Sequence, residues 1–191
     1  MRHFLDAALC AAQLKRTPRT GWQQRGAPLG GQAESVAEHC YGVVFLTMYL
    51  LDLDERDLDH ELALRLAILH DFAESLVGDL PNTINRYLSP GVKHRAERAA
   101  LEEIVEELPV AEQYLDVWEQ YEAGESPEAK VVKDADLLDM MIQAYFYEQA
   151  GQRNLDEFWQ NVTSARFHTP CARALYMELM ARREALYEHE P

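Results

Sequence analysis

The chain has 191 residues, of which 48% are hydrophobic and 27% are charged, and its formal net charge is −15. This composition is typical of a soluble globular protein, and the length is sufficient for one domain with a substantial core. The acidic balance argues against duplex nucleic acid as a partner, because binding to phosphate backbones needs a basic surface. The three cysteines, Cys10, Cys40 and Cys171, form neither a disulfide framework nor a CxxC pair, which indicates a reducing, cytoplasmic setting.

Hydrophobic residues recur at helical spacing along nearly the whole chain, and no segment alternates at period two for long. The pattern predicts an all-α bundle of about six main helices plus short ones. In chain order, helices are expected at about 3–16, 35–53, 58–74, 92–107, 111–123, 127–150, 155–164 and 170–188. The first segment lacks a signal-peptide pattern, and no apolar run approaches the length of a membrane span, so we expect no membrane partner.

Two irregular stretches interrupt the helices. Residues 17–34 are rich in glycine, proline and glutamine, and they carry Arg19, Trp22 and Arg25. A loop of this length in a compact domain is often functional. Residues 80–91 form the second irregular stretch, in which one short helical turn is expected.

Three of the predicted helices place a polar residue where a hydrophobic one is expected. His39 interrupts the apolar stripe of its helix, His70 and Asp71 follow an apolar helix end, and Asp136 shares a face with hydrophobic residues. Each exception has an ordinary explanation, because a lone core histidine is often simply hydrogen-bonded and a helical aspartate is usually exposed. A buried, ionised carboxylate nevertheless costs several kcal/mol unless it is paired or bound to a metal.

One divalent cation shared by the three helices would account for all of these residues. Imidazole and carboxylate ligands suit manganese, cobalt, iron or magnesium, with positions left for water. Neighbouring residues on a helix diverge by about 100°, so His70 and Asp71 reach one ion only if it lies between their directions, near the end of the helix.

The ordered motifs "SVAEHCYGV", "LHDFAESLVGDLP" and "VVKDADLLDM" resemble the HD-domain metal-dependent phosphohydrolases. More narrowly, they are similar to the 5'-deoxynucleotidase group, and "LKRTPRTGW" resembles its eukaryotic-type branch. The resemblance covers about residues 14–148. It implies a single all-α HD domain over 1–191, with a metal-binding core at about 34–150, an N-terminal helix and substrate loop at 1–33, and C-terminal helices at 151–191. It also implies a homodimer.

The resemblance assigns roles to residues of this chain. Four match the family's metal ligands: His39, His70, Asp71 and Asp136. Glu74 and Asp79 match residues that act near the attacking water and the leaving oxygen, and we expect Glu74 to be the acid and Asp79 to position the water. Arg19 is expected to bind the substrate phosphate, and Trp22 is expected to pack near the sugar. Each of these four also has an ordinary interpretation: a surface carboxylate, a helix N-cap, a surface charge and a core anchor, respectively.

Two features depart from the bacterial members of the group. Their arginine directly precedes the tryptophan, whereas Gly21 does so here and Arg19 is the nearest arginine. The loop between Trp22 and His39 also carries "GAPLGG", which lengthens it.

The remaining acidic residues and histidines near the motifs are expected to be peripheral. His94 lies in the interval where two-metal HD proteins carry extra histidines, but one histidine is too few for a second ion. His60 and His168 are expected at the surface. Asp134 and Asp139 are expected either to be exposed or to lie behind the ligands.

The predicted function is metal-dependent hydrolysis of (deoxy)nucleoside 5'-monophosphates, with a small nucleotide as the substrate. Three alternatives remain open at this point. The chain could act on nucleoside di- or triphosphates or a specialised nucleotide, it could be a di-iron HD oxygenase, or it could be a non-enzymatic module that keeps a structural metal.

Overall fold

The computed structural model describes residues 1–188, which are mostly helical and contain no β-strand. A single antiparallel bridge joins Pro18 to Ser35 and closes the base of the long loop. The all-α prediction is therefore confirmed. The helices, in chain order, are α1 (Arg2–Gln13), α2 (Thr20–Gln24), α3 (Val36–Leu53), α4 (His60–Leu69), α5 (Glu74–Val77), the 3₁₀ turn η1 (Asn82–Arg86), α6 (Val92–Val105), α7 (Ala111–Ala123), α8 (Pro127–Gln149), α9 (Asp156–Asn161), the 3₁₀ turn η2 (Ser164–Arg166) and α10 (Pro170–Glu188).

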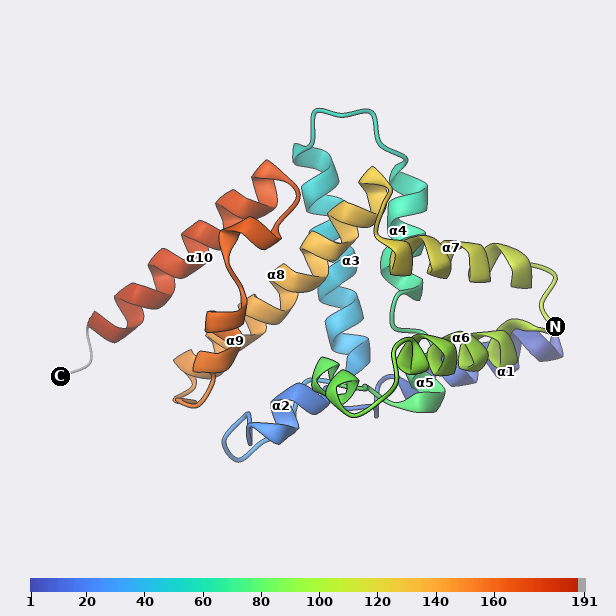
Figure 1. The fold of residues 1–191 in the computed structure, drawn as a ribbon, viewed down its shortest axis with the longest axis horizontal. Coiled ribbons are helices and arrows are strands. Elements are labelled where there is room, and N and C mark those ends of the chain that lie inside the picture. Colours follow the sequence, from blue (N-terminus) through green and yellow to red (C-terminus); the bar gives the residue numbers. More distant parts are fainter. Residues whose placement is uncertain (189–191) are drawn as a thin grey trace.

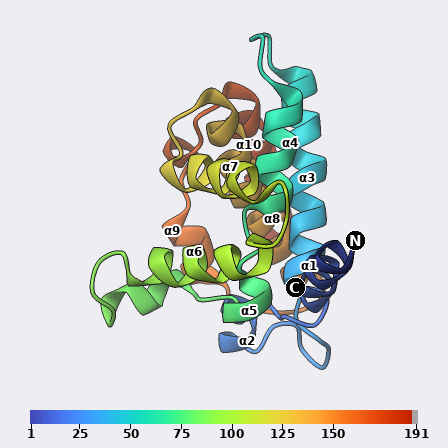
Figure 2. The same ribbon diagram turned by 90° about the vertical axis from the view of Figure 1, so that its right-hand side faces the viewer.

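The centre of the molecule is the crossing of α3 and α8, with α4 packed beside them (Figure 1). Helices α7 and α6 lie on one side of this crossing, and α10 lies on the other (Figure 1). Seen at right angles, α3 and α4 run side by side, while α1, α2 and α5 gather at one end of them (Figure 2). Fully buried residues such as Val43, Leu66 and Leu138 join the three central helices into one core.

By length and composition alone, α3 could cross a membrane, which corrects the expectation that no apolar stretch reaches that length. The same properties suit the central helix of a bundle, and both α8 and α4 pack along α3. Its start is also well defined, because Ser35 and Glu38 form a reciprocal capping box.

Most predicted helices are present with ends shifted by a few residues, and Ser126 caps α8 ahead of Pro127, as its sequence predicts. Two predictions are wrong in detail. The loop 17–34 contains the short helix α2, which the sequence pattern did not indicate. The segment expected at 155–164 is divided into α9 and η2.

The expected helix 58–74 is also broken, and this break shapes the site. α4 ends at Leu69, and the amides of Phe72 and Glu74 donate to carbonyls only three residues back, Leu69 O and Asp71 O, each at 3.1 Å. The carbonyl of His70 instead accepts a hydrogen bond from Trp118 Nε1 at 3.2 Å. His70 and Asp71 therefore lie at the end of α4, where the chain leaves the regular helix.

Candidate metal centre and active site

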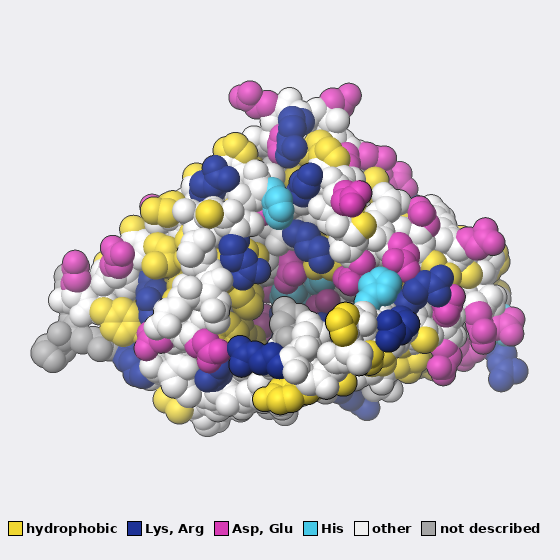
Figure 3. Space-filling view, viewed as in Figure 1, with side chains coloured by type: hydrophobic (Ala, Val, Ile, Leu, Met, Phe, Trp, Pro, Cys, Tyr) yellow, Lys and Arg dark blue, Asp and Glu magenta, His cyan; other side chains and the backbone are white. Residues whose placement is uncertain are grey.

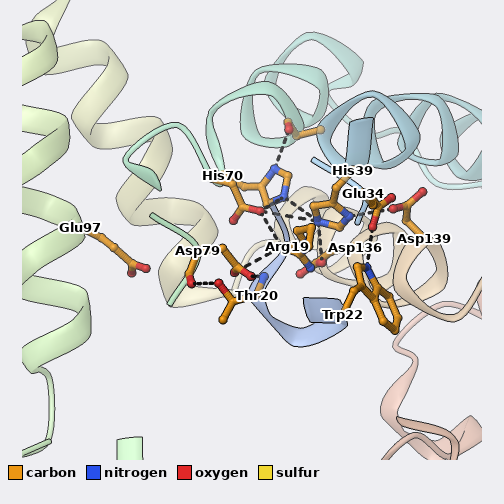
Figure 4. A network of polar contacts seen from close by, with 12 residues as sticks. Arg19, Thr20, Trp22, Glu34, His39, His70, Asp79, Glu97, Asp136 and Asp139 are labelled. Atoms are coloured by element: carbon orange, nitrogen blue, oxygen red, sulfur yellow. Dashed lines mark hydrogen bonds and ion pairs between the residues drawn. The ribbon is translucent and has the colours of Figure 1, made fainter. Parts of the chain in front are cut away.

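Two buried histidines face each other with their Nε2 atoms 3.4 Å apart (Figure 4). His39, in the first turns of α3, donates its Nδ1–H to Asp139 Oδ2 at 2.7 Å. His70, at the end of α4, donates its Nδ1–H to the carbonyl of Ala67 at 2.7 Å. Because each Nδ1 donates to its partner, the neutral form of each ring has its Nε2 lone pair directed into the site, where it can bind an ion.

Two carboxylates complete this group. Asp136 Oδ1 lies 3.3 Å from His39 Nε2, and Asp71 Oδ2 lies 3.2 Å from His70 Nε2 and 3.6 Å from His39 Nε2. Four electron-pair donors from three segments therefore converge, although lone pairs repel one another unless a cation lies between them. Nitrogen and carboxylate donors in this combination fit a divalent transition ion. The structure thus brings together all four residues that were predicted as ligands.

Electrostatics in the metal-free protein support the same interpretation. Burial raises the pKa values of Asp71 and Asp136, but the neighbouring histidines outweigh burial and hold both below the ordinary range. Burial lowers the pKa of His39, whereas hydrogen bonds to Asp136 and Asp139 raise it to about 9. A proton thus supplies the positive charge that the cluster needs, and ion binding would displace that proton.

Asp139 holds His39 from behind and fixes which ring nitrogen faces the site. It lies one turn beyond Asp136 on α8, and its carboxylate sits against Gly42 of α3. A Cβ at position 42 would overlap that carboxylate, so only glycine allows the two helices to approach this closely. Of the two options left open for Asp139, exposure or a place behind the ligands, the structure supports the second.

Replacing Asp139 with asparagine is expected to weaken divalent-ion binding by about 10- to 100-fold, because His39 loses the carboxylate that orients it and raises its basicity. Calorimetric titration of the metal-free protein with Mn²⁺ measures this change. The exposed Asp52 of the same helix pair, changed to asparagine, is the matched control. An unchanged affinity in the Asp139→Asn variant would show that His39 is positioned by packing alone.

Glu74 begins α5 beside the cluster and is only 4% exposed. Its Oε2 has no hydrogen-bond partner in the described part of the chain. Burial, reinforced by the negative charges of Asp71 and Asp79, raises the pKa of Glu74 to about 10. The carboxyl group is therefore protonated at neutral pH in the metal-free protein, which is the state that an acid needs.

Asp79 returns to the site because Gly78 adopts a left-handed backbone, with φ of 74°. Its Oδ2 accepts the amide proton of Thr20 at 2.5 Å, and its carbonyl accepts the Thr20 hydroxyl proton at 2.7 Å. Asp79 therefore caps the start of α2 rather than its own segment. This contact locks the substrate loop onto the turn that follows His70.

Arg19 lies directly against the acidic groups of the site. Its Nη1 is 3.2 Å from Asp71 Oδ2 and 3.8 Å from Asp79 Oδ1. Burial lowers the pKa of Arg19, but these carboxylates outweigh burial and raise it, so the guanidinium stays charged. Of the two interpretations that the sequence allowed for Arg19, the structure favours a site residue over a surface charge.

The whole group opens into a cleft of about 1250 Å³. Six lysine and arginine side chains line it: Arg19, Arg25, Arg86, Lys93, Lys133 and Arg166. Figure 3 looks into this hollow, where acidic and histidine side chains lie deep and basic side chains gather around them. In a chain of charge −15, this concentration of basic groups favours an anionic ligand.

Trp22 reaches the wall of this cleft, but its ring is only 2% exposed. Its Nε1 donates to Glu34 Oε2 at 2.8 Å, and its ring stacks on Phe158 at a centroid distance of 4.5 Å. The ring is thus mostly a core anchor, and contact between Trp22 and a sugar remains a prediction.

The peripheral residues fall into two groups. His60 is exposed at the first residue of α4, and His94 pairs with Glu119 at 3.2 Å on the rim of the cleft. His168, expected at the surface, is about half exposed and lines the cleft, with its Nδ1 3.0 Å from Asp134 Oδ1. Asp134 is 1% exposed and anchors the segment before α10.

Three residues that touch the site carried no assignment in the sequence analysis. Tyr121 of α7 donates its hydroxyl proton to Asp136 Oδ2 at 2.8 Å. Thr20 binds Asp79, and Phe158 covers Trp22. Tyr121 and Phe158 lie outside the quoted motifs, and Thr20 lies within "LKRTPRTGW" without a role assigned to it, so only their packing could reveal their contacts.

A helical bundle that joins a histidine, a His–Asp doublet and a distant aspartate around one point defines the HD class, and this chain belongs to the HD-domain family, which matches it over residues 11–176. Among named relatives, the 5'-deoxynucleotidase HDDC2 of Danio rerio is 36% identical over 187 residues, covering 96% of this chain and 89% of the relative. The 5'-deoxynucleotidase hdd1 of Schizosaccharomyces pombe is 38% identical over 163 residues, covering 81% and 77% respectively. A solved structure of a conserved hypothetical protein from Pyrococcus furiosus is 38% identical, with a TM-score of 0.77, and the match covers 93% of this chain and 99% of that one.

Proposed function

We propose that this chain is a metal-dependent phosphomonoesterase that removes phosphate from deoxynucleoside 5'-monophosphates. The observation that carries the proposal is the convergence of two imidazole Nε2 atoms and two carboxylates beside the buried carboxyl group of Glu74 and the guanidinium of Arg19. Curated relatives over most of the chain are named 5'-deoxynucleotidases, which supports the same substrate class.

The four ligands would hold one divalent ion, and manganese, cobalt, iron and magnesium all suit them. When bound, such an ion supplies Lewis-acid chemistry that activates water and polarises a phosphoryl oxygen. The protein's own groups perform the remaining tasks. Arg19 binds the phosphate through charge-assisted hydrogen bonds, and Asp79 accepts the proton of the attacking water.

Glu74 supplies the proton that the leaving group needs. As the new P–O bond forms, the bond between phosphorus and the 5'-oxygen breaks, and Glu74 donates its proton to that leaving oxygen. The products are inorganic phosphate and a deoxynucleoside with a free 5'-hydroxyl. The burial that raises the pKa of Glu74 keeps this proton available at neutral pH.

A panel of ribo- and deoxyribonucleotides, from mono- to triphosphate, tested with Mn²⁺, Co²⁺ and Mg²⁺, decides the substrate. We expect the highest kcat/KM with deoxynucleoside monophosphates and one phosphate released per turnover. A preference for triphosphates would favour the alternative HD phosphohydrolase. Two irons per chain by elemental analysis would favour an oxygenase, and a retained ion without turnover would favour a non-enzymatic module.

Replacing Arg19 with alanine is expected to raise KM for a monophosphate about tenfold or more while changing kcat less, because a charge-assisted phosphate contact is lost. Steady-state kinetics measure this, with Arg182→Ala on the exposed face of α10 as the control. An unchanged KM would move phosphate binding to another basic residue of the cleft.

We further propose that the protein works as a homodimer in the cytoplasm. Four exposed aromatic or apolar side chains share one face of α3: Tyr41, Phe45, Met48 and Tyr49. Such a face is a common site of association. Phe45→Asp is expected to convert the dimer to a monomer, as measured by light scattering, and a wild-type protein that is already monomeric would contradict the proposal. The three free cysteines suit a reducing compartment.

A further inference from the structure

Among the phenylalanine, tyrosine and tryptophan side chains that line the cleft, Phe158 of α9 is half-buried, whereas Trp22 and Tyr121 are buried. Trp22 is packed on several sides: it stacks on Phe158 at an interplanar angle of 29° and meets Tyr147 edge-on at 5.3 Å. Its one polar atom is taken by Glu34. Phe158, by contrast, is only partly buried and lines the cleft together with Arg19 and Asp71.

Helix α9 is held to the end of α2 by an ion pair and two hydrogen bonds. Arg25, which follows α2, forms an ion pair with Glu157. The carbonyl of Arg25 accepts hydrogen bonds from Asn154 Nδ2 at 2.5 Å and from Gln152 Nε2 at 3.2 Å. These contacts hold Phe158 over Trp22 and make α2 and α9 one wall of the cleft.

Gly21, the residue before Trp22, lies beside the phenyl ring of Phe158. A Cβ at position 21 would lie 3.5 Å from Phe158 Cζ, so the residue before Trp22 faces the edge of the phenyl ring. A long side chain at this position would compete with Phe158 for the same space. The glycine that departs from the arginine–tryptophan pattern is thus matched by an aromatic residue from the C-terminal part of the chain.

The wall also presents a charged residue and then aromatic residues, in the order in which a nucleotide presents its phosphate and its base. Arg19 is the N-cap of α2, and Trp22 follows one turn later, about 4.5 Å along the helix axis. A ligand whose phosphate lies at Arg19 and whose long axis follows α2 would bring its other end against Phe158. Aromatic rings stack on nucleobases with little dependence on base identity.

We propose that Phe158 is the nucleobase-binding residue of this cleft, where it is the outer ring of a Trp22–Phe158 stack. The inference rests on the proposed function for the identity of the ligand as a nucleotide. It predicts that recognition of the base and recognition of the phosphate are separable, because Phe158 and Arg19 lie on different segments of the wall.

The test compares a deoxynucleoside 5'-monophosphate with 2-deoxyribose 5-phosphate, which lacks the base, on metal-loaded wild type and Phe158→Leu. Leucine keeps an apolar cover on Trp22 but removes the stacking face. We expect Phe158→Leu to raise KM for the nucleotide about tenfold and to leave KM for the sugar phosphate and both kcat values nearly unchanged. Phe158→Trp should restore the nucleotide KM, and the control Phe146→Leu, on the exposed part of α8, should change neither.

Equal increases in both KM values, or no increase in either, would overturn the assignment of Phe158. A wild-type protein that hydrolyses neither compound would instead be a failure of the proposed function. In that case, calorimetric binding of the nucleotide still decides on Phe158: weaker binding to Phe158→Leu with wild-type metal content supports the assignment, and equal or absent binding overturns it. Thermal unfolding of each variant controls for loss of the α2–α9 wall.

Discussion

Replacing Asp71 with alanine is expected to abolish both divalent-ion binding and phosphate release. Asp71 Oδ2 is close to both histidine Nε2 atoms and to Arg19, so its loss removes one ligand and the partner of the phosphate-binding guanidinium. We expect kcat/KM to fall by about three orders of magnitude or more, since activation of water depends on the ion. Elemental analysis after gel filtration and a phosphate-release assay measure the two effects.

Thermal unfolding provides a readout that does not depend on turnover. An ion that binds only the folded state raises Tm with its concentration, so wild type should gain stability on addition of Mn²⁺ and Asp71→Ala should not. Asp57→Ala, in the exposed loop between α3 and α4, should behave as wild type. If Asp71→Ala kept one ion per chain and turnover within tenfold of wild type, the site would have to be rebuilt around other ligands.

Replacing Glu74 with glutamine is expected to keep the ion and to lower kcat by about 10²- to 10⁴-fold, because the leaving oxygen loses its proton donor. Burial and the neighbouring carboxylates raise the pKa of Glu74 to about 10, and a bound cation lowers that value toward neutral pH. Wild-type kcat/KM should therefore fall as pH rises through this pKa. The residual activity of Glu74→Gln should lack that alkaline limb in a pH–rate profile.

The same pKa shift predicts that Glu74→Gln, which lowers kcat, raises the stability of the metal-free protein. A carboxyl group whose pKa is raised from 4.5 in the unfolded chain to about 10 in the folded one favours folding fully only below pH 4.5, and its contribution declines as pH rises between the two values. Glu74→Gln should therefore raise the Tm of the metal-free protein more at pH 8 than at pH 5. Glu107→Gln, on an exposed turn, is the control. Near-normal turnover in Glu74→Gln would assign the acid role to Asp79.

Most of the helices could be predicted from the helical spacing of hydrophobic residues in the sequence. The start of α8 followed from Ser126 and Pro127, and both ends of α7 and the start of α10 fell where the spacing of apolar residues predicted them. The helix expected at 58–74 failed because Trp118, a partner distant in sequence, takes the His70 carbonyl that a continuing helix would use. The residues near His70 in the sequence do not indicate that Trp118 will donate to this carbonyl.

By itself, the sequence determined which residues could bind a cation and which helices carry them, because a polar group on an apolar stripe is visible in the spacing of one helix. Only the tertiary structure decided how these groups are supported and what the cleft wall presents. Asp139 reaches His39 across 100 residues of chain, and Phe158 covers Trp22 from a segment outside the metal-binding core. The first contact depends on the close approach of α3 and α8 at Gly42, and the second depends on how α9 packs against α2. Both are set by packing between helices rather than by any local pattern.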